Sequence, residues 1–257
     1  DGLLLLEDLG SEPCFAGTPP APIAERYAAA VELLADLHAR DLPEAVDDGD
    51  GGIWEIPRLG SEGYRNEVEI LLDWGLPHYL GRAASAEERE RFGAIWTPLL
   101  AEIEAGPKTW SMRDYHSPNL LWLPEREGIA RVGVIDFQDV AFAHPAYDVA
   151  SLTQDARLDV PAALEADLLQ TYVAARRARG GEFDEAGFRR AHAILAAQRA
   201  TRLLGQFVRL KVRDGKPDYM RHVPRQWDYL SRVLDEPVLR PLKLWYEDVV
   251  PADRRLV

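Results

Sequence analysis

The sequence has few sulfur-bearing residues and no long apolar run. Its 257 residues include a single cysteine, Cys14, which excludes an intramolecular disulfide framework. A lone cysteine is typical of a reducing compartment, so we predict a cytoplasmic location. The longest clean apolar run, residues 3–6, has the length of a strand. A membrane helix needs about 20 apolar residues, so no membrane partner is expected.

Positive charge is scarce relative to negative charge. Lys and Arg together number 30 against 43 Asp and Glu, which gives a formal net charge of -13 at pH 7. Nucleic acid and anionic membrane surfaces would repel such a chain, so neither is expected as a partner. A neutral or cationic small molecule is easier to accept.

The hydrophobic pattern predicts a mostly helical chain with a small hairpin. Apolar steps of three and four predict helices over residues 22–39, 64–79, 85–105, 146–155, 161–179, 184–212 and 218–234. Ser85 and Glu88 have the spacing of a capping box. Short strands are expected over residues 3–6, 110–112, 120–123 and 132–135, with the last two forming the hairpin. Residues 42–61 are polar and glycine-rich, which predicts an irregular connection. The expected fold class is α+β.

Two short loops carry the residues with the clearest chemistry. Residues 114–119 precede the hairpin, and residues 135–138 end it, so the hairpin should bring the two loops together. Phosphoryl transfer needs a carboxylate to orient the attacking hydroxyl and oxygen ligands to hold magnesium on the phosphates. Mg²⁺ prefers carboxylate, carboxamide and water oxygens. Asp114, Asn119 and Asp136 supply this set of atoms.

The order of these motifs resembles the aminoglycoside phosphotransferase/choline kinase family, whose fold is related to that of the protein kinases. Its members commonly show His-Gly-Asp-Leu-His-x-x-Asn, then an apolar strand ending in Ile-Asp-Trp or Ile-Asp-Phe. The resemblance implies that Asp114 is the catalytic aspartate, that Asn119 and Asp136 bind Mg²⁺, and that ATP is the phosphoryl donor. The loop departs from the family pattern because it begins Met112-Arg113-Asp114.

Further segments extend the resemblance over about residues 3–150. Residues 144–150 resemble the family's Gly-Asp-Pro-x-Tyr-Asp-Leu-Ala, which implies that Asp148 supports the catalytic loop. Residues 34–39 resemble its Leu-x-x-Leu-His-Ala helix. Residues 3–10 resemble the last strand of the small lobe and the hinge, which implies adenine contacts from Glu7, Asp8 and Leu9. We also expect His116 to bond locally and shape the catalytic loop.

The resemblance implies that residues 1–257 form the C-terminal lobe of a kinase. Residues 1–10 would be the last small-lobe strand and hinge, residues 110–150 the catalytic and metal loops, and residues 151–257 a helical subdomain. The family's glycine-rich phosphate loop, its phosphate-gripping lysine and that lysine's glutamate partner have no counterpart here. We expect these parts to precede Asp1 in a longer protein, and the chain alone to bind ATP poorly and not to turn over.

The wording around residues 112–124, 130–139 and 143–156 is most similar to one branch of this family, the bacterial anomeric kinases of N-acetylmuramate and N-acetylglucosamine, which serve cell-wall recycling. The resemblance implies a small amino-sugar partner phosphorylated at its C1 hydroxyl. Trp74 or Trp110 could stack on the sugar, although aromatic residues of this kind more often pack in cores. Arg113 could bind the lactyl carboxylate of N-acetylmuramate.

Other interpretations stay open on the sequence alone. The acidic net charge also suits a cationic aminoglycoside, so an aminoglycoside kinase is the main alternative. A third is a non-catalytic module that keeps the kinase-like lobe as a scaffold. A hydrolytic zinc site at Asp114 and His116 lacks a third ligand at metal-site spacing. A protein kinase is disfavoured because Gln138 stands where Asp-Phe-Gly has its glycine.

Several residues have structural interpretations in the sequence. His38 is expected to be a satisfied core histidine. Asp155 is expected to be a helix cap or a surface charge. The Arg- and Lys-rich residues 199–213 are expected to form an exposed helix face.

Overall fold

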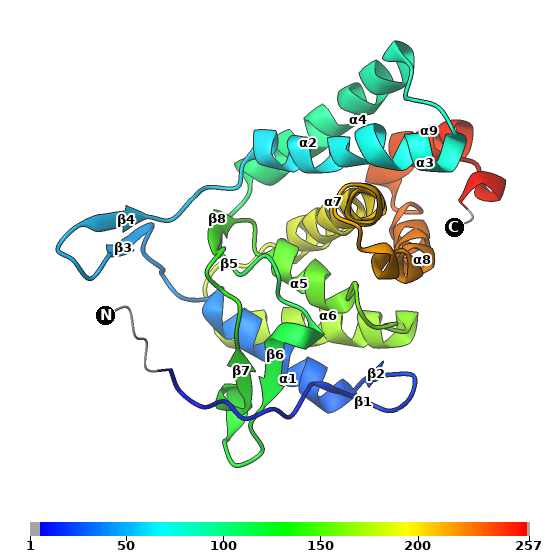
Figure 1. Ribbon diagram of the computed structural model, residues 1–257. Coiled ribbons are helices and arrows are strands. Elements are labelled where there is room, and N and C mark those ends of the chain that lie inside the picture. The colour runs from blue at the N-terminus through cyan, green and yellow to red at the C-terminus, as the bar shows by residue number, and fades with distance from the viewer. Residues whose placement is uncertain (1–5, 256–257) are drawn as a thin grey trace.

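The computed structural model describes residues 6–255 and shows a helical body with short two-stranded sheets along one side (Figure 1). The strand predicted for residues 3–6 lies outside the described residues except for Leu6. Leu6 is exposed, and residues 6–10 form no strand. Within the described part, no helix combines the length and hydropathy needed to cross a bilayer.

Helices dominate the chain, and the predicted α+β class is confirmed. The helices are α1 (Ala24–Leu37), α2 (Ser61–Ile70), α3 (Leu76–Leu80), α4 (Ala86–Ala105), α5 (Ala146–Thr153), α6 (Ala162–Ala178), α7 (Glu185–Val212), α8 (Val223–Val233) and α9 (Arg240–Val249). A π-helical turn, Leu71–Gly75, joins α2 to α3. The predicted capping box opens α4, since Glu88 N donates to Ser85 Oγ over 3.1 Å and Ser85 N to Glu88 Oε2 over 2.7 Å.

The strands pair antiparallel in separate two-stranded sheets. They are β1 (Phe15–Ala16), β2 (Ala21–Pro22), β3 (Ala45–Asp47), β4 (Ile53–Glu55), β5 (Thr109–Ser111), β6 (Leu120–Trp122), β7 (Val132–Val134) and β8 (Ala141–Ala143). The pairs are β1·β2, β3·β4, β5·β8 and β6·β7. The predicted hairpin is β6·β7, with Leu120 opposite Val134. Because the pairs β6·β7 and β5·β8 flank the two loops, they fix where those loops begin and end.

The prediction of an irregular connection over residues 42–61 is wrong in part, because this segment contains the β3·β4 hairpin. Its tip is closed by Asp48, whose Oδ1 accepts hydrogen bonds from Asp50 N and Gly52 N, both 2.9 Å. Aspartate side chains that bond nearby backbone groups are a standard way to make a turn. The glycine-rich composition therefore marked a hairpin tip.

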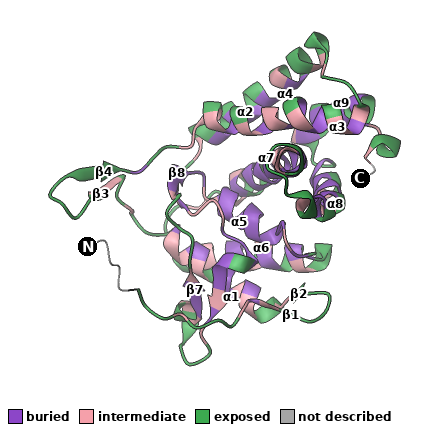
Figure 2. Cartoon of the chain, viewed as in Figure 1, coloured by how far each residue is buried: buried purple, intermediate pink, exposed green. Residues whose placement is uncertain are grey.

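Helix α7 is the central element of the helical body, and its buried surface runs along most of its length (Figure 2). It packs against α8, α5, α2 and the π-helical turn. Gly205 permits one of these contacts, since a Cβ there would lie 2.4 Å from Ile70 O. The prediction of an exposed helix face over residues 199–213 is therefore wrong for its first half, where Arg199 is buried. Helices distant in sequence cover both sides of this segment.

Candidate active site

The first residues of the catalytic loop, residues 112–119, are held by Asp148 in the first turn of α5. Asp148 Oδ1 accepts hydrogen bonds from Ser111 Oγ at 2.8 Å and Arg113 N at 3.0 Å, and its Oδ2 accepts from Met112 N at 2.6 Å. The carboxyl is fully buried. Burial raises its pKa to about 6, although the three donors oppose that shift. The contacts fix the backbone immediately before Asp114.

Arg113 has φ 62°, in the left-handed region that non-glycine residues rarely adopt. Its backbone is retained there by the bond to Asp148, and its side chain donates to Glu67 Oε1 over 2.7 Å. Such strain persists only where the surroundings over-determine the conformation, and it is frequent at active sites. Here the left-handed conformation of Arg113 changes the direction of the backbone between the residues bonded to Asp148 and Asp114.

A second buried carboxylate, Asp155, supports the other end of the catalytic loop. Its Oδ2 accepts from Ser117 N at 2.8 Å and from the Tyr27 hydroxyl at 2.9 Å. Tyr115 points into the core and donates from its hydroxyl to Ala30 O over 2.8 Å. The expectation that Asp155 is a cap or surface charge is wrong, because the side chain is completely buried between α1 and the loop.

The metal loop, residues 135–139, meets the catalytic loop at Asn119. The Asn119 amide nitrogen donates to Asp114 O over 2.9 Å and to Asp136 Oδ2 over 3.3 Å. Ile135 N donates to Asn119 O over 3.0 Å. Asp136 has φ 61°, so both loops carry one non-glycine residue in the left-handed region. The structure thus brings Asp114, Asn119 and Asp136 together.

The donor set at this meeting point fits magnesium. Because the Asn119 amide nitrogen is used within the protein, its Oδ1 is left for a ligand, and the Asp136 carboxylate is exposed beside it. Mg²⁺ is commonly held by one or two protein oxygens together with substrate phosphates and waters. No group of three or more His, Cys, Asp or Glu side chains suited to a metal occurs within residues 6–255. Asn119 and Asp136 would hold the ion, which would neutralise charge on the phosphates.

Two arginines of α7 lie close enough to Asp114 to interact with its charge. Burial works against the charge of Arg202, yet Tyr147, Glu67 and Asp114 raise its pKa above the usual value. Arg202 Nη1 also donates to the Tyr147 hydroxyl over 2.9 Å. Arg199 is buried, which lowers its pKa, and Asp114 is among the groups that oppose this shift. Sequence reasoning missed both residues because it assigned them to a solvated face.

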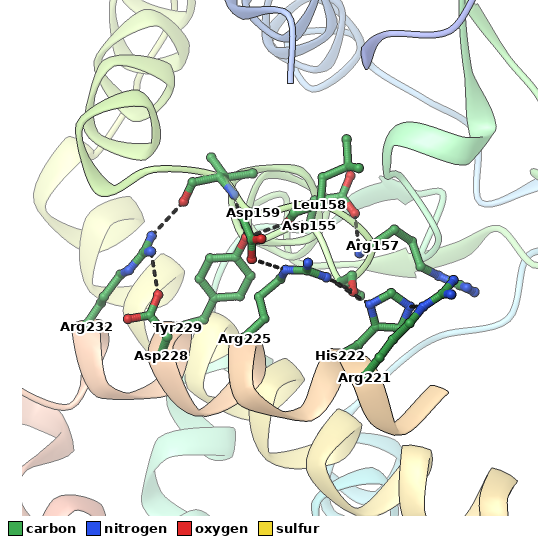
Figure 3. A network of polar contacts seen from close by, with 12 residues as sticks. Asp155, Arg157, Leu158, Asp159, Arg221, His222, Arg225, Asp228, Tyr229 and Arg232 are labelled. Atoms are coloured by element: carbon green, nitrogen blue, oxygen red, sulfur yellow. Dashed lines mark hydrogen bonds and ion pairs between the residues drawn. The ribbon is translucent and has the colours of Figure 1, made fainter. Parts of the chain in front are cut away.

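Arg157, in the segment after α5, lies near the catalytic loop, since its charge acts on His116. Figure 3 shows this region, where Arg225 donates to Ala156 O over 3.1 Å and to His222 Nδ1 over 2.9 Å. Arg221 contacts the other ring nitrogen of His222. Within residues 6–255, neither Arg157 nor Arg221 has a carboxylate within ion-pair distance. In this part of the chain, Arg157 and Arg221 therefore keep unpaired charge, whereas Arg225 pairs with Asp159.

His116 follows Asp114 by two residues and is buried. Burial lowers its pKa, Asp155 and Asp114 oppose this, and Arg199 and Arg157 reinforce it. Its backbone N–H donates to Asp114 O over 3.1 Å, which tightens the loop. The ring Nδ1 is buried without a hydrogen-bond partner among the described residues.

The two tryptophans considered for sugar stacking have other contacts. Trp110, in β5, donates from its indole nitrogen to Pro43 O over 2.7 Å. Trp74, in the π-helical turn, packs against the hydrophobic core. These contacts favour packing over a sugar platform. Neither residue contributes to the polar groups around Asp114.

The segment considered for adenine contacts lies along β7. Leu9 packs on Gly133, where a Cβ would lie 3.1 Å from the leucine methyl carbon. Glu7 pairs with Arg126, and Gly10 N donates to Asp8 Oδ1 over 2.8 Å. Leu9 therefore lies beside the strand that leads into the metal loop, whereas Glu7 reaches the turn between β6 and β7.

Family comparison agrees with this geometry. A model of the phosphotransferase enzyme family matches residues 1–189, which include both loops and α5. The chain belongs to this phosphotransferase family. Its membership accounts for the paired loops, since positioning and electrostatic stabilisation are what phosphoryl transfer requires of a protein.

Curated relatives of this phosphotransferase are kinases of amino sugars. An N-acetylmuramate/N-acetylglucosamine kinase of Caulobacter vibrioides is 39% identical over 99% of this chain and 69% of its own length. Kinases of the same name from Neisseria meningitidis and Pseudomonas putida are 30% and 29% identical over 67% and 65% of their lengths. The chain thus spans about two thirds of the length of these relatives.

Solved structures with a similar arrangement include other phosphotransferases. An ADP-bound aminoglycoside phosphotransferase has TM-score 0.44 and 15% identity, over 82% of this chain and 66% of that one. A choline/ethanolamine kinase family protein from Mesorhizobium loti has TM-score 0.42 and 14% identity, over 91% of this chain and 86% of that one.

Proposed function

We propose that this chain is the catalytic lobe of an ATP- and Mg²⁺-dependent cytoplasmic kinase that phosphorylates the C1 hydroxyl of N-acetylmuramate or N-acetylglucosamine in cell-wall recycling. The observation that carries the proposal is the Asn119 amide, which joins the Asp114 loop to the Asp136 carboxylate. This contact supports the proposal because it joins the loop that bears the proposed base to the two proposed metal ligands. The names of the curated relatives support the amino-sugar acceptor.

The proposed reaction assigns a role to each of the three side chains. Asp114 orients the C1 hydroxyl of the sugar and accepts its proton as the oxygen attacks the γ-phosphorus of ATP. Asn119 and Asp136 hold the metal that offsets the phosphate charge. Asp148 and Asp155 keep the Asp114 backbone in place through the buried bonds described above. The backbone of Glu7, Asp8 and Leu9 is proposed to contact adenine.

The charge around Asp114 favours an acidic acceptor over a cationic aminoglycoside. The whole chain is acidic, but four arginines lie near the site: Arg113 and Arg202, which contact Glu67, and Arg157 and Arg199, which act on His116. N-acetylmuramate carries a lactyl carboxylate, whereas an aminoglycoside carries ammonium groups that these arginines would repel. Local charge decides this preference, because interactions fall off within about 10 Å in salt.

Within this set, Arg157 is the best partner for the lactyl carboxylate, and Arg113 is the second. Arg113 already donates to Glu67 over 2.7 Å, while Arg157 has no carboxylate partner in residues 6–255. An unpaired guanidinium gains most from a carboxylate, since the charge-assisted bond replaces only water.

A substrate panel with the full-length protein tests the proposal. Phosphate transfer from ATP-Mg²⁺ is followed by ³¹P NMR with N-acetylmuramate, N-acetylglucosamine, methyl N-acetylglucosaminide and kanamycin. We expect both free sugars to react and the methyl glycoside, whose C1 oxygen is blocked, to remain unchanged. Asp114→Asn should lower kcat by about 10²–10⁴-fold. Phosphorylation of the methyl glycoside, or of kanamycin alone, would show that the acceptor is wrongly assigned.

A second measurement isolates the acidic part of the acceptor. Arg157→Gln should lower kcat/KM for N-acetylmuramate by about tenfold and leave N-acetylglucosamine nearly unchanged, as expected for one charge-assisted hydrogen bond. Arg190→Gln is the matched control, because Arg190 lies on the outer part of α7 and pairs with Glu102. Equal losses for both sugars would mean that Arg157 does not contact the carboxylate.

A further inference from the structure

A cavity separate from the catalytic site lies where several helix ends converge. Its volume is about 350 Å³. Its walls come from the C-terminal ends of α1, α4 and α6, the first turns of α7, and the ends of β5 and β8. Asp114, Asn119 and Asp136 do not line it. The volume lies in the range of small-molecule sites.

Three residues that line this cavity carry buried polar atoms without hydrogen-bond partners among the described residues. The three atoms are Thr109 Oγ1, His38 Nε2 and Arg176 Nη1. Each is buried and has no hydrogen-bond partner within residues 6–255. Thr109 is 6% exposed and His38 is 8% exposed. His38 is held in place through its other ring nitrogen, 2.9 Å from the Tyr172 hydroxyl. Buried polar atoms are nearly always paired, so three such atoms beside one cavity leave hydrogen bonds for a water or a ligand to make.

The opposite wall is aromatic. Tyr172 and Phe188 stack with ring centroids 4.5 Å apart and an interplanar angle of 17°, and Phe183 lies 5.6 Å from Phe188. The Arg176 guanidinium sits over the Phe183 ring at 5.5 Å. A planar apolar body could pack on these rings while its polar end reaches the orphaned groups.

The cavity wall carries charges of both signs, with Lys108 and Arg176 on one side of the balance and Glu102, Glu182 and Asp184 on the other. The Arg176 guanidinium has no carboxylate partner within the described residues, and Lys108 Nζ is held by the carbonyls of Ile103, Glu104 and Gly106, each 2.8 Å away. Two of the three acids are engaged elsewhere, and the third, Glu182, is exposed. Glu102 pairs with Arg190, and Asp184 caps α7 by accepting from Gly187 N over 2.9 Å. An anionic group would therefore be favoured next to Arg176.

We propose that this cavity binds a small molecule with a planar apolar body and a carboxylate, which would accept hydrogen bonds from Arg176 and Thr109. The site is independent of the proposed sugar kinase activity. It is connected to the catalytic loop, because β5 runs from Thr109 to Ser111, and Ser111 donates to Asp148. His144, also on the cavity wall, directly follows β8, the partner of β5. Occupancy should steady the backbone of residues 109–113.

Binding of naphthoate, with naphthamide as its neutral match, tests the proposal by calorimetry on the full-length protein. We expect saturable binding of naphthoate and about tenfold weaker binding of naphthamide, because a charge-assisted hydrogen bond is lost. Arg176→Gln and Thr109→Val should each weaken naphthoate binding, and Ala191→Leu should abolish it by filling the cavity. Arg177→Gln is the matched control, since Arg177 is the next residue on α6 and pairs with Glu185 outside the cavity.

The outcomes are distinguishable from those of the kinase assay. Absence of saturable naphthoate binding, or binding that Arg176→Gln and Ala191→Leu leave intact, overturns the site. Equal affinity for naphthamide overturns the assignment of a carboxylate. Hydrogen exchange at residues 109–113 should slow when naphthoate is bound, and unchanged exchange would overturn the connection to the catalytic loop. None of these readings depends on which sugar the protein phosphorylates.

Discussion

The catalytic loop and the metal loop lie side by side but are held in different ways. The catalytic loop is anchored by two fully buried carboxylates, Asp148 and Asp155, which accept bonds from its backbone. The metal loop is exposed, with Ile135 40% and Phe137 57% accessible. The core of the lobe thus holds the backbone on both sides of Asp114, while the metal loop depends mainly on Asn119 and on contacts within itself.

This difference predicts that the two loops fail in different ways. Damage to the buried anchors should reduce stability and activity together. Damage to the metal loop should reduce activity and leave the free energy of unfolding almost unchanged, because little buried structure depends on it.

The largest effect is expected at the metal loop. Asp136→Asn should lower kcat by about a thousandfold, since a metal supplies several kcal/mol of charge stabilisation. Asparagine tolerates the left-handed conformation that Asp136 adopts, so the fold should persist. Activity and urea unfolding are measured on the same preparation. A fall in the unfolding free energy comparable to that of a core substitution would contradict the claim that the metal loop contributes little to stability.

The next effect is expected at the buried anchor of the catalytic loop. Asp148→Asn should reduce the free energy of unfolding by about 2–4 kcal/mol and also lower kcat, because an amide cannot satisfy all the buried donors that bond the carboxylate. Asp167→Asn is the matched control, because Asp167 is an exposed residue of α6. Chemical denaturation checks the first effect and steady-state kinetics the second. Loss of activity at unchanged stability would contradict the anchoring role.

The same anchor predicts a pH dependence of stability. The folded pKa of Asp148 is about 6 against an ordinary value of 3.8, so the folded state binds this proton more tightly than the unfolded state. Its contribution to the unfolding free energy should therefore decrease between about pH 4 and pH 6, by at most about 3 kcal/mol, and be level above. Asp148→Asn lacks this titration. The difference between the two proteins should shrink over that interval, and a constant difference would refute the shift.

The smallest effect is expected at the edge of the metal loop. Gln138 donates to Asp136 Oδ1 over 2.7 Å but is itself exposed. Gln138→Ala should change the unfolding free energy by less than about 0.5 kcal/mol, as is usual for surface positions. It should raise the Mg²⁺ concentration required for half-maximal activity a few-fold, because the carboxylate loses one orienting contact. A magnesium titration of initial rates measures this change.

The sequence by itself determined the fold class and the two loops. Asp114, Asn119 and Asp136 could be picked out because a short hairpin separates them, and a hairpin returns the chain to its start whatever surrounds it. The Ser85–Glu88 capping box was likewise predictable, since both partners lie within one helical turn. Interactions that close over few residues depend on local sequence.

Only the tertiary structure decided the charge around the site and the burial of its supports. Arg199 and Arg202 looked like part of a solvated basic face, and Asp155 like a surface charge, until α7 was enclosed by α2, α5 and α8. A helical period gives the faces of a helix but not the element that each face meets. Because those partners lie far along the chain, the environment of Asp114 follows from packing alone.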